Sequence, residues 1–220
     1  AYGIENGATR MVGASTGNAG CSMACLGASI GADISVFVPS TAPRAKLAQL
    51  ALYGARVIKV EGSYDDAFNL CAEVASATGW FNRNTGQNPY TREGKKTVAF
   101  EIAEQLEWKA PDHVFVPVGD GNIISGAWKG FKEMVELGAI ERMPAIHAVQ
   151  SEESNAVSLA IQSFREGTSL DRSLKEVSAT TLADSISVDM PRDGIGAVRS
   201  VCETGGSAIE LANYSSADMS

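Results

Sequence analysis

Short apolar runs alternate along the chain with longer segments in which apolar residues recur three or four positions apart. The first pattern is typical of buried β-strands, and the second of helices that bury one face. Their regular alternation predicts an α/β fold with largely parallel sheets. Strands are predicted at Arg10–Ala14, Ile34–Pro39, Arg56–Val60, Trp80–Asn82, His113–Val118 and Ala145–Gln150.

Turn and capping residues mark where the intervening helices begin and end. Ser63 and Asp66 have the spacing of a capping box, with Asp66 in place of the usual Glu or Gln, and Gly54 and Gly79 end two helices. Helices are predicted after Asn18, after Pro43, after Ser63, over 95–108, after Asn122, over 155–164 and over 193–203. Buried residues are predicted for four of these helices. In the helix after Asn18 they are Ala19, Met23, Leu26 and Ile30, and in the helix after Pro43 they are Leu47, Leu50 and Ala51. In the helix after Ser63 they are Ala67, Leu70, Cys71 and Val74, and in the helix after Asn122 they are Ile124, Ala127, Trp128 and Phe131.

The alternation is interrupted at Arg83–Gly94, a polar stretch that contains Asn84, Asn88 and Pro89. We expect the chain to cross there between two domains, residues 1–85 and residues 86–220. Each is predicted to be a three-layer αβα subdomain with a largely parallel sheet between its helices. Residues 165–179 are predicted to form a polar loop, and residues 213–220 show no clear pattern.

Charge and hydropathy narrow the functional classes. A net charge of −8 argues against nucleic acid as a partner, because nucleic acids select basic surfaces. No apolar run approaches the roughly 20 residues that span a bilayer, and the residues after Ala1 lack the charged and apolar regions of a signal peptide. We therefore expect a cytoplasmic protein without a membrane partner.

The cysteines and histidines do not form a metal-binding pattern. Cys21 and Cys25 stand one helical turn apart, which is not the spacing of a zinc ribbon or a redox motif. His113 and His147 both lie in predicted strands. We expect no metal site, and reduced thiols at the four cysteines.

Two turns share one design, in which an apolar strand leads through a tight turn into the start of a helix. They are Ser15–Asn18 and Gly119–Asn122. Such a turn directs backbone N–H groups and the positive end of the helix dipole toward one point, where an anion is the natural ligand. Each could also be a tight turn without a ligand, with Ser15 capping a helix. A carboxylate such as that of Asp120 would repel a bound phosphate unless it faces away.

Taken together, the two turns predict an enzyme of a particular kind. A turn with hydroxyl and amide groups suits a carboxylate, whereas a glycine-rich turn suits a phosphate. The pair is therefore typical of a cleft enzyme that binds a phosphorylated cofactor and an amino acid.

Several segments resemble one family in the same order along the chain. Residues 14–20 resemble the S-x-G-N loop of fold-type II pyridoxal-phosphate enzymes, and of threonine synthases in particular. The resemblance covers nearly the whole chain up to about Glu210. The other segments that carry it are 43–55, 88–97, 116–119, and 193–194 running on to 205–206.

The resemblance implies roles for residues of both turns. Pyridoxal phosphate would be bound through its ring oxygen by Asn18, and through its phosphate by Gly119, Asp120, Gly121, Asn122 and Ile123. The amino-acid substrate, O-phosphohomoserine or a related hydroxy or phospho amino acid, would be bound by Ser15, Thr16, Gly17, Asn84 and Arg92. Members of the family are often dimers, so a homodimer is one expectation.

The sequence departs from the family pattern in three places. The lysine that forms the Schiff base lies in an S-F-K-D-R-like segment before the S-x-G-N loop, and residues 1–14 contain no lysine. We therefore expect a chain truncated at both ends that is itself inactive; its lysines, including Lys46, Lys95, Lys96, Lys129 and Lys132, are expected to be solvated charges. The phosphate loop is one residue shorter than in many threonine synthases. Thr91 stands where an arginine is expected, and Arg92 follows it.

These departures leave three functions open. The first is a lyase that converts O-phospho-L-homoserine and water to L-threonine and phosphate. The second keeps the cofactor but acts as a serine or threonine dehydratase, or as a β-replacement enzyme such as cysteate synthase. The third is an inactive α/β remnant or binding module.

Overall fold

The computed structural model describes residues 2–212 of the chain, apart from the side chain of Asp184. The chain divides into two compact units, Ala1–Asn88 and Pro89–Ser220. Residues 213–220, for which no pattern was predicted, lie outside the described residues.

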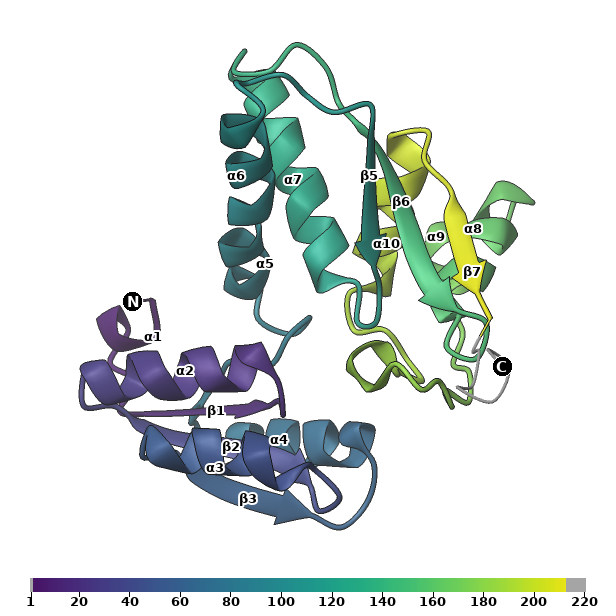
Figure 1. The fold of residues 1–220 in the computed structure, drawn as a ribbon. Helices are drawn as coiled ribbons and strands as arrows, with labels where there is room; N and C mark the ends of the chain where they lie inside the picture. The colour runs from purple at the N-terminus through teal and green to yellow at the C-terminus, as the bar shows by residue number, and fades with distance from the viewer. Residues whose placement is uncertain (1, 213–220) are drawn as a thin grey trace, which may run out of the picture. The chain divides into compact units, whose positions relative to one another are not determined.

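The first unit contains a four-stranded parallel sheet in the order β3-β2-β1-β4, of which Figure 1 labels β1, β2 and β3. Each strand coincides with a predicted one to within a residue or two. The strands are β1 (Arg10–Ala14), β2 (Asp33–Pro39), β3 (Arg56–Val60) and β4 (Phe81–Asn82). A short helix, α1 (Tyr2–Glu5), precedes them and was not predicted.

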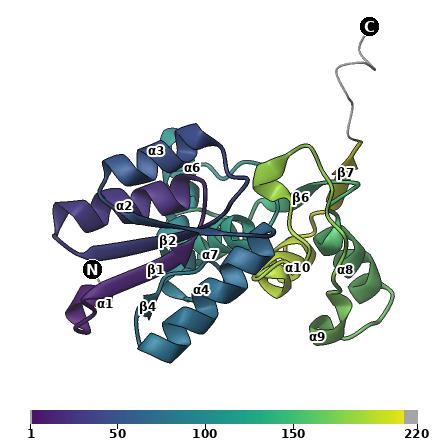
Figure 2. The same ribbon diagram turned by 90° about the horizontal axis from the view of Figure 1, so that it is seen from below.

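Helices cover both faces of this sheet, as Figure 2 shows. On one face lie α2 (Asn18–Ser29) and α3 (Arg44–Leu52), and on the other α4 (Tyr64–Thr78). Within β2, Val36 and Val38 belong to the core beneath α2 and α3, whereas Phe37 faces α4. This alternation is the period of two expected of a strand.

Local signals at the ends of α4 are confirmed. Oγ of Ser63 accepts from the N–H of Asp66, and the Asp66 carboxylate accepts from the N–H of Ser63, 2.7 Å away. Gly79 ends the helix with a φ of +70°. The predicted buried residues Ala67 and Cys71 are correct, but Leu70 is exposed, and Phe68 and Ala75 are buried in addition.

The predicted buried face of α2 is correct at Met23 and wrong at Leu26 and Ile30. Leu26 and Ile30 are 63% and 57% exposed, whereas the residues that pack on the sheet are small ones next to Met23. A Cβ atom on Gly27 would lie 2.2 Å from Cγ1 of Ile34. The helix approaches the sheet so closely that only the face rich in glycine and alanine fits there. In α3, Leu50 is buried as predicted and Ala51 is exposed.

The second unit contains a three-stranded parallel sheet in the order β5-β6-β7. β5 (His113–Pro117) and β6 (Ala145–Ser151) were predicted, whereas β7 (Ala208–Leu211) was not. Its helices are α5 (Tyr90–Lys95), α6 (Thr97–Gln105), α7 (Asn122–Glu136), α8 (Ala156–Arg165), α9 (Leu170–Ser173) and α10 (Gly194–Glu203), with a short 3₁₀ helix, η1, at Asp184–Ile186.

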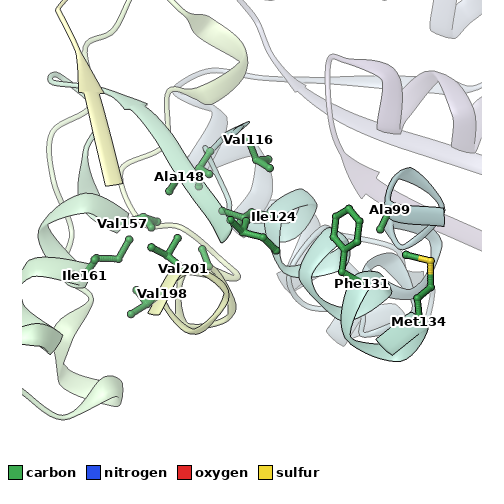
Figure 3. Packing of buried hydrophobic residues seen from close by; sticks show 14 of the residues in the cluster. Ala99, Val116, Ile124, Phe131, Met134, Ala148, Val157, Ile161, Val198 and Val201 are labelled. Atoms are coloured by element: carbon green, nitrogen blue, oxygen red, sulfur yellow. The ribbon is translucent and has the colours of Figure 1, made fainter. Parts of the chain in front are cut away.

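One face of this sheet packs on a continuous apolar core. Figure 3 shows Ile124 of α7 between two groups of side chains, one around Phe131 and Met134 and the other on α8 and α10. The opposite face carries His113, Phe115 and His147, and the Phe115 ring is 58% exposed. Parallel sheets are normally covered on both faces. In this unit the helical layer predicted for the second face is therefore not seen in the described residues.

The helix predicted over 95–108 begins earlier and is divided in two. α5 starts at Tyr90, inside the stretch predicted to be a polar crossing, and α6 follows it. Both pack closely on α7, because a Cβ on Gly126 would lie 2.6 Å from Cβ of Lys95, and one on Gly130 would lie 2.8 Å from Cβ of Ala99. Two glycines one helical turn apart thus let the helices approach.

Two of the lysines predicted to be solvated take part in a closed ring of ion pairs between these helices. Nζ of Lys96 lies 2.7 Å from Glu93 and 2.6 Å from Glu133, and Nζ of Lys129 is paired with the same two carboxylates. Lys96 is largely buried by these contacts. The prediction of a solvated charge is therefore wrong for Lys96, whereas the Lys129 side chain is paired but 36% exposed. No helix of the described residues is long and apolar enough to cross a membrane.

Candidate functional site

The Ser15–Asn18 turn joins the carboxyl end of β1 to the start of α2. Oγ of Ser15 accepts hydrogen bonds from the N–H groups of Gly17, at 3.3 Å, and Gly20, at 3.1 Å. Ser15 therefore bonds to an N–H of the first turn of α2, although the N-cap residue of the helix is Gly17. Since both bonds use lone pairs of the oxygen, the hydroxyl proton is left to donate to a ligand. Thr16 and Gly17 are half-buried, and Asn18, the first helical residue, is exposed.

Asn84 supports this turn from the segment after β4. Its Oδ1 accepts from the N–H of Ala14 at 2.7 Å, and its Nδ2 donates to the carbonyl of Phe68 at 3.5 Å. The side chain is buried, and its Oδ1 also accepts a hydrogen bond from the Cys71 thiol, with Sγ 3.6 Å away. Burial raises the pKa of Cys71 to about 11, so this thiol stays protonated at neutral pH. Contact between Asn84 and a substrate stays a prediction.

Arg83, beside Asn84, is a residue that the sequence did not single out. It follows β4 at the carboxyl edge of the sheet, and its N–H donates to the carbonyl of Val12 at 2.8 Å. Burial lowers the pKa of its guanidinium. An arginine at the ligand-binding edge of a parallel sheet is a signal that sequence reading could have used.

The second turn, Gly119–Asn122, joins β5 to α7. Gly121 has a φ of +85°, which residues with a side chain rarely adopt, and a Cβ there would lie 2.6 Å from the carbonyl oxygen of Asp193. A Cβ on Gly119 would lie 3.0 Å from Cα of Ile186. Gly121 is therefore required for the backbone to follow this path, and a side chain at position 119 would be tightly packed. Ile123 is half exposed, in the first turn of α7.

The loop is held by the segment that leads into α10. The N–H of Asp193 donates to the carbonyl of Asp120 at 2.8 Å, and the N–H of Arg192 donates to Oδ1 of Asp120 at 3.3 Å. The Asp120 carboxylate thus bonds to the backbone at Arg192, and its effect on a bound phosphate stays a prediction. The N-terminal ends of α7 and α10 meet at this point.

Asp193 joins three elements through its carboxylate. Oδ2 accepts from Nε of Arg92 at 3.0 Å and from Nδ2 of Asn122 at 3.2 Å, while Oδ1 is paired with Nη2 of Arg92. The predicted site residues Arg92 and Asn122 are therefore brought together, by a residue that sequence reasoning had noted only as part of a resembling segment. Contact between Arg92 and a substrate phosphate stays a prediction.

These residues fit a phosphate group. The N–H groups in the first turn of α7 have no partner within the helix, and the positive end of its dipole lies at the same place. Oδ1 of Asn122 is buried and has no hydrogen-bond partner among the described residues. This oxygen can only accept a hydrogen bond, and a doubly charged phosphate has no donor, so the fit to a phosphate rests on the N–H groups and the dipole of α7.

Known sequences resemble the chain over most of its length. It is 36% identical to the threonine synthase of Methanocaldococcus jannaschii over 200 residues, which is 89% of this chain and 47% of that protein. It is 34% identical to the threonine synthase of Methanosarcina acetivorans over 206 residues, 93% of this chain and 49% of that protein. The chain thus spans about half the length of the curated relatives it matches.

Solved structures share the fold. Threonine deaminase isoform 2 from Solanum lycopersicum matches with a TM-score of 0.75 at 21% identity, over 96% of this chain and 58% of that one. Maize serine racemase matches with a TM-score of 0.72 at 21% identity, with the same coverage of the two chains.

The family model "Pyridoxal-phosphate dependent enzyme" matches residues 2–219, almost the entire chain. That match agrees with the parallel sheets of both units and with the resemblance of their two turns to fold-type II enzymes. The chain belongs to the family of pyridoxal-phosphate dependent enzymes.

Proposed function

We propose that the chain is the part of a lyase of threonine synthase type that carries the substrate-carboxylate turn and the cofactor-phosphate loop. The whole enzyme would convert O-phospho-L-homoserine and water to L-threonine and phosphate. The observation that carries the proposal is the 34–36% identity to two threonine synthases over about nine tenths of the chain. The geometry of the two turns supports it.

In this proposal the first unit holds the amino acid. Ser15, with both bonds from Gly17 and Gly20 on its oxygen, directs its hydroxyl proton toward the substrate carboxylate. The backbone N–H of Thr16 adds to the same anion site at the start of α2, whereas that of Gly17 is bonded to Oγ of Ser15. Asn18, exposed beside them, donates to the ring oxygen of the cofactor.

The second unit holds the cofactor phosphate. The backbone N–H groups of Gly119–Ile123 bind the phosphate oxygens, aided by the dipole of α7. When bound, pyridoxal phosphate supplies the electron sink for the reaction. The lysine that anchors the cofactor would come from polypeptide outside these 220 residues. The cytoplasmic location and the homodimer remain predictions.

Product analysis tests the reaction. The full-length product of the gene is given phosphohomoserine, threonine, or phosphoserine with sulfite, each with pyridoxal phosphate. We expect threonine and phosphate from the first substrate. A 2-oxo acid from threonine would instead identify a dehydratase, and cysteate from phosphoserine with sulfite a β-replacement enzyme. Absence of turnover on all three would favour the inactive module.

A further inference from the structure

Arg92 and Asp193 form a charge pair that is one of the most buried in the second unit. Two nitrogens of the guanidinium face the two carboxylate oxygens, one at 3.0 Å. The Asp193 side chain is only 5% exposed, whereas that of Arg92 is 36% exposed. Two parallel hydrogen bonds between a guanidinium and a carboxylate fix the orientation of both side chains as well as balancing their charges. The pair therefore holds α5 against the start of α10.

The negative member of this pair lies at the wall of the phosphate loop. Its Oδ2 is 3.2 Å from Nδ2 of Asn122, the first residue of α7, and its backbone N–H is bonded to Asp120. A buried carboxylate without a partner would repel a phosphate bound at the start of α7. The site can accept an anion only if this charge is balanced.

The backbone is shaped to bring the carboxylate to this place. A Cβ on Gly196 would lie 2.6 Å from Oδ1 of Asp193, and a Cβ on Gly121 would lie 2.6 Å from its carbonyl oxygen. Two glycines thus leave room for one aspartate. Its contacts orient Asn122, which points Nδ2 at the carboxylate and leaves Oδ1 unsatisfied.

We propose that Asp193 is a positioning residue of the phosphate loop, and that Arg92 serves to neutralise it so that the loop accepts a doubly charged phosphate. This inference rests on the proposed function of the loop. It gives Arg92 a role through Asp193, and direct contact of Arg92 with a bound phosphate is the alternative.

Binding of pyridoxal phosphate to the full-length product of the gene, with pyridoxal as the counterpart that lacks the phosphate, distinguishes the two roles. The variants are Arg92→Gln, Asp193→Asn and the double variant, and the controls are Arg199→Gln and Asp171→Asn on exposed positions of the same unit. Equilibrium dialysis gives the affinities, and circular dichroism establishes that each variant is folded.

Arg92→Gln should weaken the binding of pyridoxal phosphate on the order of tenfold or more. The reason is that the unbalanced negative charge of Asp193 then repels the phosphate from a few ångströms away, at an effective dielectric constant near 20. Pyridoxal should bind unchanged. Adding Asp193→Asn to Arg92→Gln should restore most of the loss, since the unbalanced charge is removed. Both controls should bind as the wild type does.

Other outcomes overturn the inference. If the double variant binds pyridoxal phosphate as weakly as Arg92→Gln does, Arg92 contacts the phosphate itself. If Arg92→Gln binds it as the wild type does, the pair has no part in the site. If Arg92→Gln does not fold, Arg92→Lys keeps the charge and should bind within a few-fold of wild type; a tenfold loss there overturns neutralisation. A wild type that binds pyridoxal as well as pyridoxal phosphate overturns the proposed function of the loop along with the inference.

Discussion

Oδ1 of Asn84 lies 2.7 Å from the backbone nitrogen of Ala14, and this bond joins residues 70 positions apart. It ties the segment after β4 to the last residue of β1, immediately before the Ser15 turn. Because Asn84 also bonds to Phe68 of α4, one buried amide holds three elements of the first unit. The position of the Ser15–Asn18 turn therefore depends on a residue of the segment that follows β4.

Asn84→Ala should destabilise the first unit by about 1–3 kcal/mol, because the N–H of Ala14 is left buried without an acceptor. Urea unfolding followed by circular dichroism measures the loss, and faster hydrogen exchange at the Ala14 amide locates it. Asn6→Ala is the control, since Asn6 is exposed and bonds only locally, to the carbonyl of Tyr2. Equal stability of the two variants would contradict the role given to Asn84.

We expect the free energy of unfolding to depend on pH through His147, which is bonded to His113. The N–H of Ser207 donates to Nδ1 of His147 at 3.1 Å, so this nitrogen carries no proton, and Nε2–H of His147 donates to Nδ1 of His113 at 2.9 Å. Burial, and then the proximity of His113, lower the pKa of His147. The unfolded chain therefore binds a proton more readily than the folded one.

Stability from this group is complete above the unfolded pKa of about 6.5 and is lost as the pH falls below it toward the folded pKa. Wild type and His147→Gln should thus differ most in free energy of unfolding near pH 7.5, and less at pH 5.5. Urea titrations at both values give the comparison. His113→Gln is the partner variant, and should keep part of the pH dependence because His147 remains buried. A constant difference at the two pH values would refute the assignment.

The ring of Glu93, Lys96, Lys129 and Glu133 should contribute little to the free energy of unfolding, and most at low salt. Hydrogen bonds from Lys129 lower the pKa of Glu93, and those from Lys96 lower the pKa of Glu133, so the contribution is present above the unfolded pKa and is lost as the pH falls through the folded values. Glu133→Gln should cost about 0.5–1 kcal/mol at low salt. Urea unfolding in low salt and in 1 M NaCl should show that the cost becomes smaller on screening, although it does not vanish because Lys96 is largely buried. Glu136→Gln, at an exposed position of the same helix, is the control.

The sequence pattern predicted the strands better than the contacts between them. Buried strands such as β2 show their apolar run whatever surrounds them, so their limits are readable. β7 was missed because it is short and follows Gly206, whose Cβ would lie 1.8 Å from the carbonyl of Ile146; that close approach, and not an apolar run, places the strand. The buried face of α2 was missed for the same kind of reason, since Gly27 packs where a large residue cannot.

The sequence predicted the two loops of the candidate site but not the ion pair beside the second one. A strand, a glycine turn and a helix start are local features, and both turns are visible in the sequence. The pair of Arg92 and Asp193 spans 101 positions. Only the packing of α5 and α10 on α7 brings these two charges together, and no periodicity encodes that arrangement.

Gly121 and Gly138 provide a matched test of the phosphate loop. Both have a positive φ, +85° and +72°, but Cβ would meet Asp193 at the first and open space at the second. Gly138→Ala should therefore cost about 1–2 kcal/mol from the left-handed backbone alone. Gly121→Ala should cost at least about 1 kcal/mol more, from overpacking. Because the displaced atoms belong to the loop, Gly121→Ala should also lose affinity for pyridoxal phosphate, whereas Gly138→Ala should keep it. Thermal unfolding and equilibrium dialysis measure the two effects, and equal losses in both variants would show that the contact with Asp193 does not shape the loop.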